Sequence, residues 1–330
     1  MLRVALLGAG RIGRVHAETI AAHPRAELAV IHDPVEAAAS ELASRFGTTT
    51  SGDVDSILAD DRIGAVVIGT PTPTHVDLIT AAVRAGKAVL CEKPIDLDLT
   101  RVDECWSQVK DAGVPIMVGF NRRFDPSFAA IRRRVAEGEL GRLEQLLIVS
   151  RDPAPPPAAY LGASGGLYRD MMIHDLDLAR FFLGDITQVQ AMGTSMVAPH
   201  IAEAGDVDSA MVLLQGTNGE LCQITNSRRA AFGYDQRLEA FGEKGMLSAG
   251  NQTGTSVQFC GAAGTEQRDP YLNFFLDRYL PAYHAELDHF VTSVLAGTPP
   301  SPSFADGREA LRLADAANES LRTGAAVKLS

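Results

Sequence analysis

The stretch Gly8-Ala9-Gly10-Arg11-Ile12-Gly13 decides the fold of this 330-residue chain. It matches the pattern Gly-x-Gly-x-x-Gly, follows an apolar run over Val4–Leu7 that predicts a strand, and opens a helical pattern over Ile12–Ala22. In this context the first glycine permits a tight turn, the second lets the backbone approach a pyrophosphate, and the third lets the helix pack closely on the strand. Free N–H groups at the start of the helix then face the phosphates. Gly8, Gly10, Arg11, Ile12 and Gly13 are therefore predicted to bind a dinucleotide; the alternative is a merely flexible glycine loop.

Short apolar runs alternate with helical patterns through the first third of the chain. The runs lie at Leu28–Ile31, Ala65–Ile68, Ala88–Cys91 and Pro115–Val118. The helical patterns cover Val35–Phe46, His75–Ala85 and Thr100–Ala112. Apolar runs without polar alternation are typical of strands buried on both faces, hence of a parallel sheet. The repetition predicts an α/β fold whose N-terminal domain, residues 1–120, is a doubly wound Rossmann sheet.

The pattern changes after about residue 121, where runs of strand character follow one another with turn pairs such as Asn218-Gly219 between them. Strands are expected at Leu146–Ser150, Val189–Met196, Ser209–Leu214, Glu220–Thr225, Arg237–Phe241 and Val257–Cys260. Helices are expected at Phe128–Glu137, His174–Leu183, Tyr279–Leu295 and Asp306–Leu321. Serial strands joined by short turns indicate an open, mostly antiparallel sheet. Residues 121–330 are therefore predicted to form a C-terminal α+β domain, with the last helices free to pack back on the first domain.

Composition excludes several classes of protein. The chain carries 41 acidic against 30 basic residues, a net charge of -11, and an acidic surface repels nucleic acid and anionic membranes. The run at Val4–Leu7 is too short for a signal peptide, and no apolar stretch is long enough to span a bilayer. The four cysteines form no Cys-x-x-Cys pair and none lies at ligand spacing from a histidine, so neither a disulfide framework nor a metal site is expected. These features favour a cytoplasmic enzyme without a metal.

Asp33 lies about twenty residues beyond the glycine stretch, at the end of the second predicted strand. An acidic side chain at this point hydrogen-bonds the adenosine ribose hydroxyls and would repel a 2′-phosphate, so NAD is favoured over NADP. The alternative is that Asp33 caps a helix that starts at Pro34, and both roles can hold together. Arg11 and Arg14 leave some room for NADP.

Glu92-Lys93-Pro94 follows the predicted strand Ala88–Cys91. Ligands of open α/β sheets bind outside the carboxyl ends of the strands, so Glu92 and Lys93 are expected at the cofactor crevice. An amine there can hydrogen-bond a substrate hydroxyl and stabilise the alkoxide as it forms. The alternative is a surface lysine paired to Glu92.

Asp170 and His174 are four residues apart, which places both side chains on one face if the segment is helical. Histidine titrates near neutral pH and can accept a hydroxyl proton, while a carboxylate beside it orients the ring and stabilises its charged form. The glycines of the predicted loop Gly162–Gly166 would let this segment approach a ligand. The alternative is a buried histidine that caps a helix.

Gly119 to Phe124 form the junction of the two predicted domains, where ligand sites are common. Arg123 could bind sugar hydroxyls there, or pair with surface carboxylates. Farther along, the run Asp152–Pro157 predicts a stiff loop, because proline lacks the N–H donor that a strand ladder needs.

The chain resembles the glucose–fructose oxidoreductase, inositol dehydrogenase and rhizopine-catabolism (Gfo/Idh/MocA) family over essentially its whole length. The shared motifs are the glycine stretch, Thr70-Pro71 with His75, Glu92-Lys93-Pro94, Gly119 to Arg123, and Asp170-x-x-x-His174-Asp175. The resemblance implies catalytic roles for Lys93, Asp170 and His174, and substrate contacts for Arg123, Asp152 and Tyr234. It also implies that Thr70, Pro71 and His75 line the nicotinamide side, and that the protein is a homotetramer built on the open sheet.

Within that family the chain is most similar to the inositol dehydrogenases, through Ser150 to Pro153, Gly233 to Arg237 and Phe275 to Tyr279. The expected reaction is therefore NAD-dependent oxidation of a ring hydroxyl of a cyclic polyol, with myo-inositol giving 2-keto-myo-inositol. Another inositol isomer or an aldose is the first alternative. A non-catalytic NAD-sensing regulator on the same fold is the second.

Overall fold

The computed structural model describes residues 1–329, which fold into two compact units. The first unit joins Met1–Phe124 to Pro281–Leu311. The second unit joins Asp125–Leu280 to the residues from Arg312 onward. Each unit has its own main sheet and its own apolar core.

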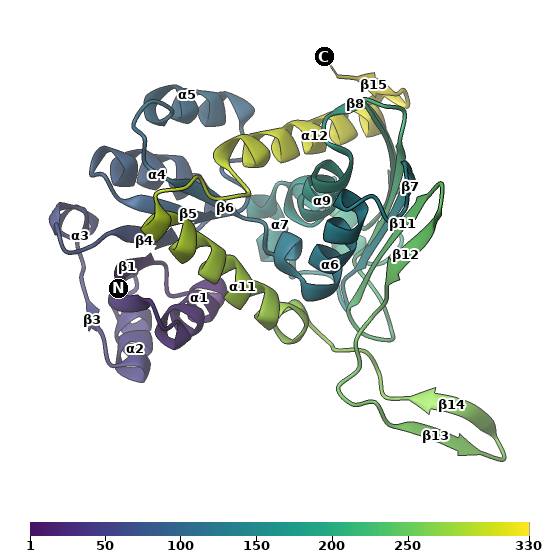
Figure 1. Cartoon of the computed structure of the whole chain (residues 1–330), viewed down its shortest axis with the longest axis horizontal. Coiled ribbons are helices and arrows are strands. Elements are labelled where there is room, and N and C mark those ends of the chain that lie inside the picture. Colours follow the sequence, from purple (N-terminus) through teal and green to yellow (C-terminus); the bar gives the residue numbers. More distant parts are fainter. Residues whose placement is uncertain (330) are drawn as a thin grey trace. The chain divides into compact units, whose positions relative to one another are not determined.

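The first unit is built on a six-stranded parallel sheet in the order β3-β2-β1-β4-β5-β6. Its strands are β1 (Leu2–Leu7), β2 (Ala26–His32), β3 (Thr49–Thr50), β4 (Ala65–Ile68), β5 (Ala88–Glu92) and β6 (Ile116–Gly119). The helices between them are α1 (Arg11–Ala22), α2 (Glu36–Phe46), α3 (Val54–Ala59), α4 (His75–Arg84) and α5 (Leu99–Val109), with the short 3-10 helices η1 (Thr72–Thr74) and η2 (Asn121–Phe124). In Figure 1, α1 and α2 lie on one side of this sheet and α4 and α5 on the other.

Burial explains why the central strands of this sheet read as unbroken apolar runs. Every residue of β4 and of β5 is buried, which requires helices on both faces. The later part of α11 (Phe275–Ala296) adds Leu287, Phe290 and Val291 to the same core. The first unit is therefore a doubly wound Rossmann sheet, as the sequence predicts.

The second unit is built on a seven-stranded sheet in the order β12-β11-β7-β10-β9-β8-β15. Its strands are β7 (Leu143–Arg151), β8 (Ile186–Thr194), β9 (Ser209–Gly216), β10 (Leu221–Ser227), β11 (Asp235–Gly242), β12 (Gly245–Ala249) and β15 (Val327–Lys328). Its helices are α6 (Pro126–Ala136), α7 (Ala158–Ser164), α8 (Gly166–Asp170), α9 (Ile173–Leu183), α10 (Pro199–Glu203) and α12 (Phe304–Thr323), the last beginning in the first unit. The pairs are antiparallel except that β7 and β10 run parallel.

The two faces of the seven-stranded sheet differ sharply. Inward residues such as Val189, Val212 and Ile224 are fully buried in a core that α9 and α12 complete. The opposite face has no helix over it in Figure 1 and carries large exposed apolar side chains. These are Met192, Met211, Leu213, Leu221, Phe241 and Met246, and the strand register sets Met192 opposite Met211 and Phe241 opposite Met246.

The predicted fold class is confirmed, while several short elements had no clear signal in the sequence. The strand pattern missed β3, β12, β14 (Gly264–Arg268) and β15, and the helical pattern missed α3, α7, α8 and α10. The predicted loop Gly162–Gly166 is wrong, because α7 and α8 occupy most of it. The predicted strand Val189–Met196 ends at Thr194, where the chain turns toward α10.

Two further observations bear on the class of protein. Among residues 1–329 no helix is both long enough and apolar enough to cross a bilayer. In the same part of the chain, no cluster of His, Cys, Asp and Glu side chains is arranged to hold a metal ion.

Candidate active site

The glycine loop after β1 has close backbone packing on one side and open space on the other. Gly8 has a positive φ of 104°, and a Cβ there would lie 2.6 Å from the carbonyl oxygen of Gly69. A Cβ on Gly13 would lie 2.0 Å from the carbonyl oxygen of Gly8. A Cβ on Gly10 would meet nothing within 4 Å. The loop therefore needs glycine at 8 and 13 for its own packing, whereas Gly10 borders space that a ligand can occupy.

Asp33 supports this loop with both oxygens of its carboxylate. Oδ2 accepts a hydrogen bond from the backbone N–H of Ala9 at 2.7 Å, and Oδ1 accepts one from Val35 at 2.8 Å. The second contact is a local side-chain turn and not the helix cap that the sequence offers as an alternative, because α2 begins at Glu36 and its N-cap residue, Val35, has no side-chain cap. The half-buried side chain thus joins the end of β2 to the glycine loop.

The other residues that the sequence predicts to bind the dinucleotide, Arg11 and Ile12, lie at the start of α1. Arg11 is exposed in the first turn of that helix, and Ile12 is half-buried behind it. A Cβ on Gly69 would lie 3.4 Å from Cγ2 of Ile12, so the end of β4 packs directly on this turn. The carboxyl ends of β1 and β4 therefore form one continuous surface with the start of α1.

His75 links the two segments that follow β4 and β5. It is the first residue of α4 and is buried, with Nε2 2.8 Å from the carbonyl oxygen of Thr70 and Nδ1 2.8 Å from that of Pro94. A neutral imidazole has one N–H, so both contacts are hydrogen bonds at once only in the imidazolium form. Thr70 and Pro71 lie in the segment that His75 holds, and Thr74 Oγ1 bonds back to the Pro71 carbonyl.

Glu92, the last residue of β5, is held by a second buried histidine. Its Oε1 lies 2.7 Å from Nε2 of His16, which comes from α1. Gly119 at the end of β6 leaves room for this carboxylate, since a Cβ there would lie 3.2 Å from Oε2. Lys93 is half-buried directly after Glu92. The sequence prediction includes Glu92 but not His16, because no local pattern joins residues on different strands and helices.

Arg123 lies in η2 with a buried guanidinium. It donates from Nη2 to Asp306 at 3.1 Å and from Nη1 to Ser301 Oγ at 3.4 Å. Burial acts to raise the pKa of the Asp306 carboxyl, but Arg123 and the Ser303 donors together lower it below its ordinary value. Arg123 thus pairs with a carboxylate, which is the alternative to binding sugar hydroxyls that the sequence left open.

The first unit thus fits a dinucleotide at the carboxyl edge of its sheet. All six strands are parallel, so the glycine loop, Asp33, Thr70 and Glu92-Lys93 emerge at that edge. The space at Gly10 and the N-terminal end of α1 suit a pyrophosphate, and Asp33 lies where a ribose is expected. NAD, when bound there, supplies hydride transfer chemistry through its nicotinamide.

In the second unit, a buried arginine brings two predicted site residues together. Arg228 is 2% exposed and donates from Nη2 to Asp170 Oδ2 at 3.1 Å. Its Nη1 lies 3.8 Å from Oδ2 of Asp152. The hydroxyl of Tyr160 donates to the other oxygen of Asp170 at 2.8 Å. Arg228 and Tyr160 are additions to the predicted site.

The parallel pairing of β7 and β10 explains this cluster. In their register Arg151 lies opposite Ser227, and the N–H of Asp152 donates to the carbonyl of Ser227 at 2.9 Å. Asp152 and Arg228 are therefore the first residues beyond two neighbouring strands that end at the same edge. The sequence prediction missed Arg228 because it gave a mostly antiparallel sheet without saying which strands pair, and only the parallel pairing of β7 and β10 brings these two strand ends to one edge.

The single helical turn predicted for Asp170 and His174 is wrong. α8 ends at Asp170, Met171 and Met172 form a turn, and α9 begins at Ile173. The carbonyl of Leu167 accepts from the N–H groups of both Met171 and Met172, which closes α8. His174 is half-buried in the first turn of α9, so the two side chains are presented by different helices.

Asp175, next to His174, anchors the start of α9 in a buried polar network. It is fully buried and accepts from Ser150 Oγ at 2.6 Å and from Asn226 Nδ2 at 2.8 Å. Ser150 Oγ also lies 3.0 Å from Gln236 Oε1, which accepts from the hydroxyl of Tyr279 at 3.1 Å. Residues from β7, β10, β11 and α11 thus hold the backbone that carries His174.

Tyr234 is buried just before β11, where the sequence places a substrate contact. Its ring packs edge-on against Tyr279, with centroids 5.9 Å apart, and its backbone N–H donates to Leu272. Tyr279 is 1% exposed and serves this network, so its role is to pack and to hydrogen-bond within the unit.

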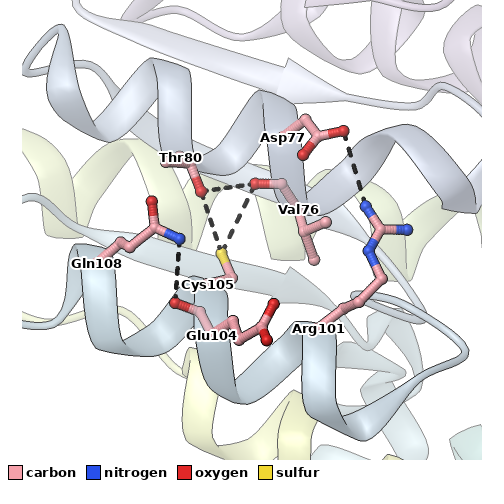
Figure 2. Close-up of a pocket in the computed structure, with 7 residues that line it drawn as sticks. All are labelled: Val76, Asp77, Thr80, Arg101, Glu104, Cys105 and Gln108. Carbon is pink, nitrogen blue, oxygen red and sulfur yellow. Dashed lines mark hydrogen bonds and ion pairs between the residues drawn. The ribbon is translucent and has the colours of Figure 1, made fainter.

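A small hollow of about 80 Å³ on the first unit is lined by none of the predicted site residues. It lies between α4 and α5, and Figure 2 shows the residues that line it: Val76, Asp77, Thr80, Arg101, Glu104, Cys105 and Gln108. Arg101 reaches both Asp77 and, at 3.0 Å, Asp96 beyond Pro94. These contacts brace α4, which carries His75, against the segment after β5.

A glycine-loop cradle on a parallel sheet, with an acid and a histidine on the helices α8 and α9 of a second unit, is typical of an oxidoreductase of the NAD-binding Rossmann class. Residues 2–120 match the model of the oxidoreductase family with an NAD-binding Rossmann fold, and residues 128–248 match the GFO/IDH/MocA C-terminal domain. The chain belongs to the Gfo/Idh/MocA family, which confirms the resemblance seen in its motifs.

Relatives match the chain over almost its full length. Inositol 2-dehydrogenase of Rhizobium meliloti is 46% identical over 97% of this chain and 97% of its own. A myo-inositol dehydrogenase structure from Corynebacterium glutamicum is 54% identical with a TM-score of 0.98, covering 100% of this chain and 99% of its own. A scyllo-inositol dehydrogenase from Lactobacillus casei, with bound NAD(H) and scyllo-inositol, is 29% identical with a TM-score of 0.91 over 99% of both chains.

Two alanine substitutions in the glycine loop separate packing from ligand space. Gly13→Ala forces a methyl group against the Gly8 carbonyl, so we expect a loss of about 1–3 kcal/mol in stability together with weaker NADH binding. Gly10→Ala meets no protein atom, so the melting temperature without ligand stays within about 2 °C while NADH binding weakens about tenfold or more. Thermal unfolding and NADH fluorescence titration measure both. Equal destabilisation by the two variants would contradict this assignment of the loop.

Proposed function

We propose that this protein is an NAD-dependent inositol dehydrogenase that oxidises a ring secondary hydroxyl, with myo-inositol converted to 2-keto-myo-inositol. The observation that carries the proposal is the near full-length similarity to proteins named inositol 2-dehydrogenase and myo-inositol dehydrogenase. A scyllo-inositol dehydrogenase among the similar structures makes that isomer the nearest competing substrate.

In the proposed mechanism His174 takes the proton of the substrate hydroxyl. Lys93 donates to the same oxygen and stabilises the negative charge that develops on it. Asp170 stabilises the imidazolium, and its own charge is held in place by Arg228 and Tyr160. Asp175 fixes the backbone that carries His174. No metal is part of this scheme, because the amine and the imidazole supply the electrostatic stabilisation.

Contacts to substrate and cofactor complete the proposal. Asp152, Arg123 and Tyr234 bind the polyol beside Lys93, Asp170 and His174. We assign cofactor binding to the glycine loop, Asp33, Glu92 and the segment from Thr70 to His75. Because His75 is buried and both of its ring nitrogens contact backbone carbonyl oxygens, it acts by shaping this segment.

We infer that NAD is preferred over NADP and that the working form is a cytoplasmic homotetramer. Asp33 supports the first inference, since its carboxylate would repel a 2′-phosphate. The open face of the seven-stranded sheet supports the second, since an exposed apolar surface built from paired side chains such as Met192 with Met211 is typical of a subunit interface. Free thiols at Cys91, Cys105 and Cys222 suit the reducing cytoplasm.

Lys93→Ala and His174→Ala test the reaction. Each should lower kcat by about a hundredfold or more while NADH affinity stays within about threefold, because both groups act on the reacting oxygen. Kinetics with NAD on myo-, scyllo- and chiro-inositol and on glucose measure this and rank the substrates. Near-normal turnover in either variant would remove that residue from the mechanism. NADH binding without turnover of any polyol would favour the NAD-sensing alternative.

Asp33→Asn tests the cofactor preference. The amide keeps an oxygen acceptor for the loop but removes the charge that repels a 2′-phosphate. We expect kcat/KM for NADP relative to NAD to rise about tenfold, with a smaller stability loss than in Asp33→Ala. An unchanged ratio in both variants would leave Asp33 only its structural contacts with Ala9 and Val35.

The double substitution Met192→Lys and Met211→Lys tests the assembly. Placing two ammonium groups opposite each other on the open face should shift the protein to smaller species in sedimentation velocity, because they repel and resist burial. Leu295→Lys, at an exposed position of α11, is the matched control and should leave the assembly unchanged. An unaltered tetramer in the double variant would place the interface elsewhere.

A further inference from the structure

Glu286 is a carboxyl group enclosed in the first unit without a hydrogen-bond partner. It lies in the later part of α11 and is fully buried, and neither of its oxygens has a donor among residues 1–329. Its helix neighbours Leu287 and Phe290 belong to the apolar core. Removing an ionised carboxylate from water without a partner is so costly that a group in such a place is neutralised instead.

A second carboxyl group, that of Glu92, shares this region. Burial raises the pKa of Glu286 well above its ordinary value of 4.5, and the charge of Glu92 raises it further. Two carboxyl groups that interact in this way do not both ionise near neutral pH. Glu92 has His16 as a partner at 2.7 Å and Glu286 has none, so Glu286 is the carboxyl group expected to keep its proton.

Other titratable groups lie close to Glu92 and to the part of α11 that carries Glu286. Tyr283, one turn earlier on α11, packs edge-on against His16 with ring centroids 5.9 Å apart. His16 comes from α1 and Glu92 from β5, while Gly119 of β6 makes room for the Glu92 carboxylate. Helix α11 therefore places the Tyr283 ring against the buried pair of His16 and Glu92, with Glu286 one turn further along the same helix.

We propose that Glu286 keeps its proton in the working enzyme and donates it as a hydrogen bond to Glu92, which positions the strand end that carries Lys93. The proposal rests on the proposed function for the part that Lys93 plays in the reaction. Glu286 is a positioning residue that acts through Glu92. It makes Glu92 a carboxylate held from two sides, by His16 of α1 and by Glu286 of α11.

This arrangement matters because Lys93 is effective only if its amine reaches one point in space. Misplacement of a reacting group by about 1 Å can cost a hundredfold in rate. On the far side of Lys93, His75 already binds the carbonyl of Pro94. With Glu92 fixed as well, the backbone on both sides of Lys93 is restrained.

The first test compares the full-length wild type with Glu286→Gln in thermal unfolding without ligand from pH 4 to pH 9. A carboxyl group whose folded pKa is raised contributes stability that is full below its unfolded value of 4.5 and is lost as pH rises toward the folded pKa. Glutamine has no proton to lose. The folding equilibrium constant of Glu286→Gln relative to wild type should therefore grow by up to about tenfold per pH unit above 4.5.

The matched control is Glu104→Gln, an exposed position on α5 that should show no such growth with pH. Infrared spectroscopy at pH 8 gives an independent readout, because a protonated buried carboxyl has a C=O stretch that Glu286→Gln would lack. A stability difference that does not change with pH, or the same infrared spectrum in both proteins, would overturn the protonated state.

The second test separates positioning from folding by kinetics. Glu286→Gln keeps a neutral donor and should retain kcat within about twofold, while Glu286→Leu, similar in size but without a donor, should lower kcat about tenfold or more with KM for NAD little changed. Equal kcat in the two variants would overturn the positioning role. The stability and infrared measurements need no substrate, so they stand or fail independently of the inositol assignment.

Discussion

Parallel pairing of strands is the constraint on which the candidate site residues of each unit depend. In a parallel pair the carboxyl ends of the strands lie at one edge, so the residues that follow them become neighbours whatever their separation in sequence. The first unit uses this along its whole six-stranded sheet, where Asp33 reaches the loop after β1 and His75 joins the segments after β4 and β5. In the second unit, the parallel pair of β7 and β10 places Asp152 beside Arg228.

The features that sequence predicts well are those that short-range patterns encode. The glycine stretch after an apolar run, Asp33 at the end of the next strand, and the unbroken apolar strands all depend on neighbours within one β-α unit. The Rossmann unit and the family could be predicted for that reason. By contrast, β7 and β10 are separated by two strands and several helices, and their register depends on tertiary packing. Arg228 consequently had no signal, although its partners Asp152 and Asp170 did.

Spacing alone also misled the interpretation of Asp170 and His174. Four residues apart is one helical turn only if the backbone hydrogen bonds continue, and here the carbonyl of Leu167 closes α8 before α9 begins. The break has a physical consequence. It lets Asp170 turn toward Arg228 and Tyr160, while Asp175 in the next helix is drawn into the network of Ser150 and Asn226. In one continuous helix, the directions of the Asp170 and Asp175 side chains would be fixed relative to each other by a single helix axis.

The two units handle buried acidic groups in different ways, and the difference fits the parts proposed for them. Around His174 the carboxyl groups have donors, because a guanidinium binds Asp170 while Ser150 and Asn226 bind Asp175. A negative carboxylate beside His174 would stabilise an imidazolium that has just taken a proton. In the first unit, Glu286 has no such donor among residues 1–329 and is neutral on our proposal, so it adds no negative charge to that of Glu92. A second negative charge at that point would oppose the alkoxide that Lys93 has to stabilise. One carboxyl group kept neutral thus lets a buried acid position the lysine without weakening its electrostatic effect on the substrate oxygen.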